Sequence, residues 1–126
     1  MKRPPPHRLG DLQLRIMQVL WEVGSGSVAQ VHEALEPGLA YTTVATMLRK
    51  MESRGLVRHW LEGRRFIYEA AVEAGDVVQS MTGDLLDRLF AGSLSEMVSR
   101  LLETRDVGEE ELDELEKLIA QRKRRT

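Results

Sequence analysis

The chain has 126 residues, of which 42% are apolar and 30% charged, a size and composition that suit one compact domain or a small domain with a helical appendage. The absence of cysteine excludes disulfides, cysteine nucleophiles and thiolate metal sites. No apolar run follows the basic residues at the N-terminus, and no apolar stretch approaches the roughly 18 residues of a membrane span. We therefore expect a cytoplasmic protein with no secretion signal and no membrane contact.

The net charge of −2 conceals an asymmetry between the two parts of the chain. Residues 1–70 carry ten Lys/Arg and seven Asp/Glu, whereas residues 71–126 carry eight and thirteen. A basic part joined to an acidic part favours two separate tasks, although uneven scatter of surface charge is the alternative.

Two helices are predicted after a proline-rich segment at 1–8 that we expect to be a disordered arm. Apolar residues at helical spacing predict the first helix from about Gly10, and Gly24-Ser25-Gly26 ends it. Ser27 and Gln30 match a capping box at the start of the second helix, in which each side chain satisfies the other residue's backbone amide.

A third helix is predicted over 41–53, with Gly55 as its C-terminal stop. Its apolar residues recur at i, i+3, i+4 and i+7 and define a buried face: Val44, Met47, Leu48 and Met51. The opposite face carries short hydroxyls and a cation, namely Thr42, Thr46, Arg49 and Ser53, with Thr43 and Lys50 at its edges.

The period then changes from helical to alternating. Two short extended segments, 56–61 and 65–69, flank a turn that contains Gly63, which predicts a β-hairpin. Arg64 and Arg65 at its tip have the charge that contact with a phosphate backbone requires, although a merely solubilising turn is the alternative.

Helical spacing returns after the hairpin and predicts a helix over about 73–90. A further helix is predicted to begin at a capping box of Ser93 and Glu96. The acidic start and basic end of a last helix match the helix macrodipole. These helices are too apolar to stand alone in water, so we expect them to form a homodimer interface. The alternative is that they fold back onto the N-terminal part. The side chains expected in the interface are Val78, Met81, Leu85, Leu89, Leu94, Met97, Val98, Leu101, Leu112, Leu115 and Ile119.

Three helices followed by a hairpin is the order of a winged helix-turn-helix, in which the third helix enters the major groove of DNA. The predicted fold class is therefore mainly α with a small β-hairpin. It comprises a winged helix-turn-helix domain over 9–72 and a C-terminal helical dimerisation region over 73–126. Contacts with double-stranded DNA are expected from the third helix and the hairpin, namely from Tyr41, Thr42, Thr43, Thr46, Arg49, Lys50, Arg64 and Arg65.

Three stretches carry a family resemblance: residues 9–21, residues 31–44, which include Ala40-Tyr41-Thr42-Thr43-Val44, and residues 50–57. Through them the chain resembles the penicillinase-repressor family of winged-helix regulators, the BlaI/MecI-like group. The resemblance covers nearly the whole chain from Leu9 to about Ile119. It implies a dimeric repressor whose third helix recognises an operator, with Thr42, Thr43 and Thr46 at recognition positions.

The resemblance also implies an upstream sensor or protease as a partner, because well-known members are induced by cleavage of an Asn-Phe bond in the C-terminal region. This chain has Arg100-Leu101 at the matching place. The copper-responsive members use a cysteine pattern, which this chain lacks.

No motif of enzymatic chemistry is present in the sequence, and we predict no catalysis and no bound metal or cofactor. Its histidines are dispersed. His7 falls in the arm, His32 is expected to be partly buried, and His59 is expected to be a solvated strand residue, with phosphate contact as the alternative.

The predicted function is that of a homodimeric transcriptional repressor that binds a palindromic operator through the third helix and the hairpin. Two alternatives stay open: a small-molecule-responsive regulator of the same architecture, and a winged helix used as a module for protein–protein contact.

Overall fold

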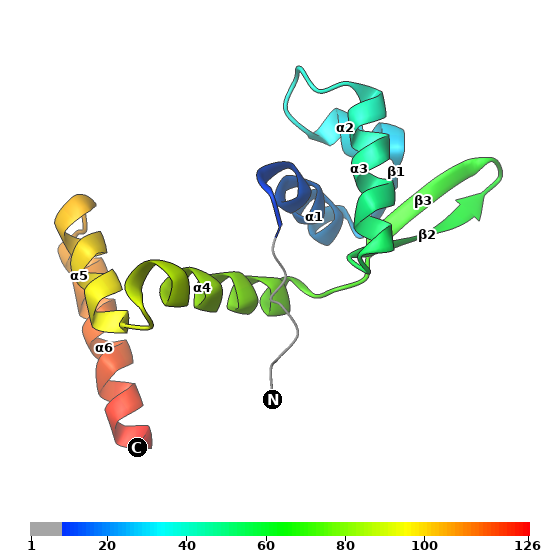
Figure 1. The fold of residues 1–126 in the computed structure, drawn as a ribbon. Helices are drawn as coiled ribbons and strands as arrows, with labels where there is room; N and C mark the ends of the chain where they lie inside the picture. The colour runs from blue at the N-terminus through cyan, green and yellow to red at the C-terminus, as the bar shows by residue number, and fades with distance from the viewer. Residues whose placement is uncertain (1–8) are drawn as a thin grey trace. The chain divides into compact units, whose positions relative to one another are not determined.

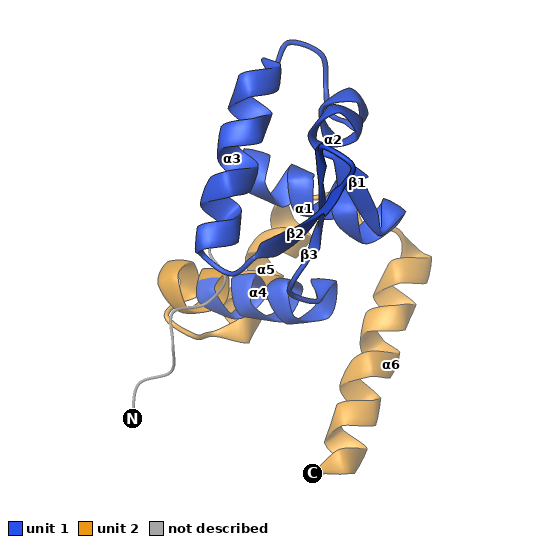
Figure 2. Ribbon diagram, turned by 90° about the vertical axis from the view of Figure 1, so that its right-hand side faces the viewer, with its two compact units in different colours: residues 1–84 blue, residues 85–126 orange. Residues whose placement is uncertain are grey.

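The computed structural model describes residues 9–126, and the predicted arm at 1–8 lies outside them. The described residues form six helices and three short strands (Figure 1). The chain divides into two compact units, with the boundary between Asp84 and Leu85 (Figure 2). The domain boundary predicted from the sequence, between residues 72 and 73, lies just before α4 (Ala74–Phe90), whereas the two units divide within that helix.

The first unit combines helices with a small antiparallel sheet. Three helices come first, and a hairpin follows them: α1 (Asp11–Val23), α2 (Val28–Ala34), α3 (Tyr41–Ser53), β2 (Val57–Glu62) and β3 (Arg65–Ala70). These elements match the predicted helices and hairpin, and the winged helix-turn-helix fold is confirmed. We call α3 the recognition helix and the β2–β3 hairpin the wing.

A third strand, β1 (Ser25–Ser27), is absent from the sequence-based prediction, which has only a helix stop at this place. It pairs with β3 and gives the sheet order β1-β3-β2. Ser25 lies opposite Glu69, and Ser27 lies opposite Ile67. The segment that ends α1 therefore also covers the outer edge of β3, whose backbone groups would otherwise lack strand partners.

The capping box predicted for α2 is present. The Ser27 hydroxyl accepts a hydrogen bond from the Gln30 amide at 3.2 Å, and the Gln30 side chain accepts one from the Ser27 amide at 2.8 Å. The same serine thus ends β1 and starts α2.

The core of the first unit gathers the apolar faces of its three helices against the sheet. The predicted buried face of α3 is confirmed for Val44, Leu48 and Met51, while Met47 is only half-buried. The buried side chains that form one cluster are Ile16, Met17, Leu20, Val31, Leu35, Val44, Leu48, Met51, Leu56, Val57 and Tyr68. This core fixes which face of α3 is left on the surface.

Gln13 fastens α1 to the recognition helix. Its side-chain amide donates to the Met47 sulfur at 3.4 Å, and its carbonyl oxygen accepts from the Arg54 guanidinium at 3.2 Å. The same oxygen accepts from the Gly10 amide at 3.1 Å, at the start of α1.

The recognition helix ends in a turn that leads directly into the wing. Gly55 has φ +80°, a left-handed value that glycine adopts at little cost. The Gly55 amide donates to the Glu52 carbonyl at 2.9 Å, and the Leu56 amide donates to the Met51 carbonyl at 3.0 Å. This Schellman pattern sends Leu56 into the core beside the helix end and so fixes where β2 begins.

The second unit holds the rest of α4, together with α5 (Leu94–Thr104) and α6 (Glu109–Arg125). No side chain of α5 or α6 is buried. The Ser93 hydroxyl caps α5 by accepting the Glu96 amide at 3.2 Å. The second half of the predicted capping box does not form, because the Ser93 amide donates to the Phe90 carbonyl at 2.9 Å instead. Across residues 9–126, no helix is long and apolar enough to cross a membrane.

Candidate nucleic-acid interface

One face of the recognition helix points away from the core and carries polar and cationic side chains. The residues exposed there include all those placed on this face or at its edges by helical phase: Thr42, Thr43, Thr46, Arg49, Lys50 and Ser53. The Arg49 guanidinium lies 3.5 Å from the Thr46 hydroxyl, so these two side chains are neighbours on the surface. Ala40 at the N-cap offers no side-chain acceptor to the first-turn amides, which leaves the positive end of the helix dipole uncapped by a side chain.

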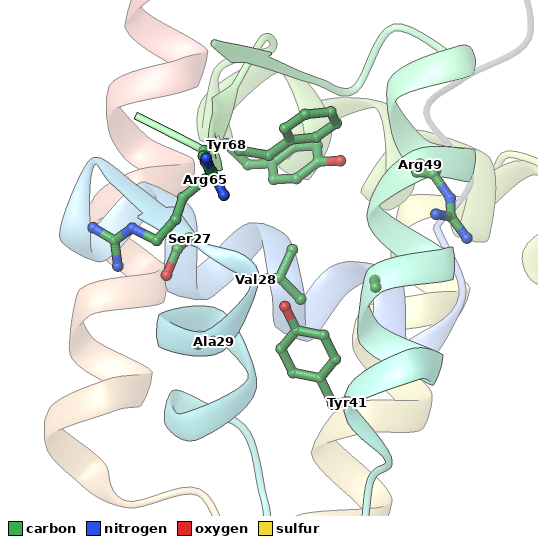
Figure 3. A pocket seen from close by; sticks show the side chains of 10 residues that line it. Ser27, Val28, Ala29, Tyr41, Arg49, Arg65 and Tyr68 are labelled. Carbon is green, nitrogen blue, oxygen red and sulfur yellow. The ribbon is translucent and has the colours of Figure 1, made fainter. Parts of the chain in front are cut away.

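A hollow of about 280 Å³ is lined by the recognition helix, the wing and the start of α2 with Ser27 (Figure 3). Arg49 lines it from α3, and Arg64 and Arg65 line it from the wing. Tyr41, Phe66 and Tyr68 supply aromatic lining. The structure thus brings arginines from two separate elements to the lining of one hollow that has no carboxylate among the described residues that line it, an arrangement that suits a polyanion.

The wing tip is a two-residue turn, because Glu62 pairs with Arg65 across the hairpin. Gly63 has φ +63° at the first turn position, where a tight hairpin of this kind needs glycine. Arg64 and Arg65 are both exposed at this tip. The turn therefore holds two adjacent guanidinium groups at the end of the wing.

His59 is not a solvated strand residue, and that expectation is wrong. Its Nδ1 lies 2.7 and 2.8 Å from the two carboxylate oxygens of Glu52, in the last turn of α3. Its ring stacks on Phe66, with centroids 4.1 Å apart and an interplanar angle of 13°. The Glu52 carboxylate and the Phe66 ring enclose the imidazole from two elements, and no local sequence pattern signals their approach.

Tyr68 forms a buried part of the hollow's lining. Burial raises the pKa of its phenol, the Glu52 charge raises that pKa further, and the Arg49 charge opposes them. The phenol is therefore neutral at physiological pH and adds no negative charge to the hollow.

His32 is partly buried, as predicted, and it holds the chain just before the recognition helix. Its Nε2 lies 2.7 Å from the Leu39 carbonyl oxygen, so the imidazole N–H donates there. Its ring also meets Tyr41 edge-on, with centroids 5.9 Å apart. His32 thus supports the first residue of α3 from the neighbouring helix.

The family model described as Penicillinase repressor matches residues 9–121. The chain belongs to the penicillinase repressor family. Within this family it is 29% identical over 127 aligned residues to the Penicillinase repressor of Bacillus licheniformis, covering 99% of this chain and 98% of the relative. It is 33% identical over 118 residues to the Transcriptional regulator BlaI of Mycobacterium tuberculosis, covering 90% and 84% respectively.

A solved structure of the DNA-binding domain of the repressor BlaI superposes with a TM-score of 0.50 and 29% identity. The superposition covers 60% of this chain and 93% of the BlaI domain. The penicillinase repressor family and this structural match together assign the chain to the BlaI/MecI-type transcriptional repressors with a winged-helix DNA-binding fold. These relatives are named as repressors and regulators, not as enzymes.

Proposed function

We propose that the protein is a homodimeric transcriptional repressor that binds a palindromic operator through the recognition helix and the wing. The observation that carries the proposal is the exposed face of α3, on which Thr46 and Arg49 are neighbours. Arg49 also lines the hollow that the wing arginines line. A helix of this kind fits the major groove, while a basic hairpin beside it suits the sugar-phosphate backbone.

In this proposal, Thr46 and Arg49 contact base edges. A guanidinium can donate two hydrogen bonds to guanine, and a threonine methyl can pack on the methyl group of thymine. Phosphate contacts come from the uncapped start of the helix and from its edges, and the residues involved are Tyr41, Thr42, Thr43 and Lys50.

The exposed face of α3 also argues against use of this domain for protein–protein contact. Tyr41 is the only large apolar side chain of α3 that is exposed. A helix that docked on a protein partner would present an apolar surface to it. The hydroxyls and cations that occupy this face favour nucleic acid.

The homodimer is proposed from α4, α5 and α6. The side chains expected in the dimer interface lie at the surface of a single chain or are only half-buried, and those with the largest exposed area are Val78, Leu85, Leu89, Leu94, Leu101, Leu112 and Ile119. A second copy would remove this apolar surface from water. A two-fold dimer would also present two recognition helices, which is the arrangement that a palindromic site requires.

The proposed repressor works in the cytoplasm, where bacterial DNA lies, and responds to an upstream sensor or protease.

Arg100 and Leu101 lie inside α5, so the peptide bond between them is part of a regular helix. A protease would have to unwind α5 to cleave it. We therefore propose that cleavage at this bond is not the inducing event.

The test is fluorescence anisotropy of the purified full-length chain on a duplex taken from upstream of its own gene, with a shuffled duplex as control. A specific repressor is expected to prefer the first duplex by about a thousandfold or more, with affinity that falls steeply in salt. The proposal would be refuted by equally weak binding to both duplexes, together with a genome-wide selection of fragments in which no fragment binds better.

A further inference from the structure

Glu52 and His59 connect the recognition helix to the wing near the point where the two elements part. Glu52 lies in the last turn of α3, and His59 lies on β2, seven residues later. Their side chains are 31% and 29% exposed, so water reaches the pair from only part of its surface. A hydrogen bond to a carboxylate in such a half-buried place is stronger than one between neutral groups on the open surface.

The contact continues from His59 toward the wing tip. The imidazole stacks on Phe66, and Phe66 directly follows Arg65 on β3. Arg64, Arg65 and Phe66 line the same hollow as Arg49 of the recognition helix. The contacts therefore connect the Glu52 carboxylate of α3, through His59, to Phe66, which adjoins the basic tip of the wing.

The outer half of the wing has little other packing. Leu61 and Phe66 lie opposite each other in the hairpin, and both are exposed. The inner half of the hairpin is anchored, because β1 pairs with β3 and because Val57, Ile67 and Tyr68 are buried, but the tip lies beyond these contacts. The contact of His59 with Glu52 adds a tie between β2 and α3, and through Phe66 it continues toward the part of the hairpin that lacks other packing.

We propose that Glu52, His59 and Phe66 form a positioning device that sets the wing against the recognition helix and thereby places Arg64 and Arg65 on the DNA backbone. This inference rests on the proposed DNA-binding function. A protonated imidazole is attracted to the Glu52 carboxylate more strongly than a neutral one. The wing is therefore held more firmly when the imidazole carries a proton, and DNA affinity is expected to be higher at acid pH than at alkaline pH.

The surroundings of the imidazole fit this direction. From α3 the charged groups are Glu52 and Arg49, whose charge also acts on Tyr68. From β3 the titratable group is Tyr68, 5.5 Å away between ring centroids, and burial keeps it neutral. On β2 the neighbouring Arg58 is engaged by Glu69 at 2.6 Å. Glu52 is therefore the charged group in direct contact with the imidazole, and the attraction between the two side chains strengthens when the imidazole is protonated.

The experiment measures binding of the full-length chain to a fluorescent duplex of mixed sequence at low salt, from about pH 5.5 to 8. Mixed sequence suffices because backbone contacts do not depend on the bases. At acid pH the affinity of the wild type is expected to rise about two- to fivefold more than that of His59→Gln, a variant that cannot carry a positive charge at this residue. Glu52→Gln is expected to lose that extra gain although it keeps His59.

Two outcomes on DNA would overturn the inference alone. An undiminished gain in Glu52→Gln would show that His59 acts as an ordinary cation near phosphate. An undiminished gain in the Arg64→Ala/Arg65→Ala double variant would show that the effect does not pass through the wing tip. No binding of the wild type to any duplex at any pH would instead remove the proposed function, and the inference with it.

A measurement without DNA separates positioning from loss of folding. Trp60 lies next to His59 on β2, and Trp21→Phe leaves it as the only tryptophan of the chain. In that background the Trp60 emission is expected to change with pH when Glu52 is present and to stay constant in Glu52→Gln, while thermal melts show that both are folded. The same pH response in both proteins would overturn the inference.

Discussion

The indole N–H of Trp21 donates a hydrogen bond to the carbonyl oxygen of Val72 at 3.0 Å. The contact joins the last turn of α1 to the segment that leaves β3, 51 residues further along the chain. Both residues pack against the core. The exit from the sheet is therefore fastened to the first helix by a polar contact at the edge of an apolar cluster.

Trp21→Phe should destabilise the first unit, because it removes the N–H donor and leaves the Val72 carbonyl without this partner. The expected loss is about 1–2 kcal/mol in the free energy of unfolding, measured by chemical denaturation. The control is Trp60→Phe, whose indole donates to Glu62 at the surface and whose loss should cost less than about 0.5 kcal/mol. Equal losses for the two variants would contradict the structural role of Trp21.

Gly55→Ala should destabilise the protein by about 1 kcal/mol, because an alanine disfavours the left-handed φ of +80° at the end of the recognition helix. An added Cβ at residue 55 meets no atom within 4 Å, so backbone conformation is the only source of the cost. The matched control is Gly83→Ala inside α4, where the Cβ also meets nothing. That variant should instead raise stability by roughly 0.5–1 kcal/mol, and thermal melts of both proteins check the opposite signs.

Arg64→Ala and Arg65→Ala should each weaken binding on every duplex tested and reduce the slope of log affinity against log salt by about 1. The reason is that each variant loses one of the proposed phosphate contacts. Arg58→Ala on the same hairpin is the control, since Arg58 is paired with Glu69. A slope that is unchanged in both tip variants would mean that the wing does not touch the backbone.

Thr46→Ala should reduce the preference for the operator over shuffled DNA by about 1–3 kcal/mol, because the proposed contact to a base edge is lost. Competition anisotropy with both duplexes gives this difference directly. Thr82→Ala, at an exposed position of α4, should leave the preference unchanged. An equal loss on both duplexes would assign Thr46 to phosphate contact instead.

Leu89→Glu should convert the proposed dimer into monomers, as seen by sedimentation velocity, because it places a charge in the proposed apolar interface. Leu89 is 69% exposed in a single chain, so the substitution has little reason to disturb the fold of that chain. Val23→Glu, at a residue of α1 with 58% exposure, is the control and should remain dimeric. A dimeric Leu89→Glu would place the interface elsewhere.

The recognition helix was predictable because its signals are local. The i, i+3, i+4, i+7 pattern from Val44 to Met51 and the stop at Gly55 lie within one short stretch, and α3 has the predicted bounds 41–53. The exposure of Thr46 and Arg49 followed from the same helical phase.

The features that sequence reasoning missed depend on residues that meet only in the fold. β1 is three residues of glycine and serine, which are typical of a turn, and its strand conformation depends on pairing with Ile67–Glu69. The contact of His59 with Glu52 depends on how the Schellman turn at Gly55 directs β2 back along the end of α3. Neither has a periodic signature in the sequence.

The lack of any buried side chain in α5 and α6 has a consequence for how the protein responds to its own abundance. If two copies supply the missing core, the folding of these helices and their association are one equilibrium that obeys mass action. Helix content and melting temperature should then rise with protein concentration. In a cell, dilution by growth would then separate the subunits and unfold the second unit at the same time. Operator occupancy would therefore depend more steeply on protein concentration than it does for one-to-one binding.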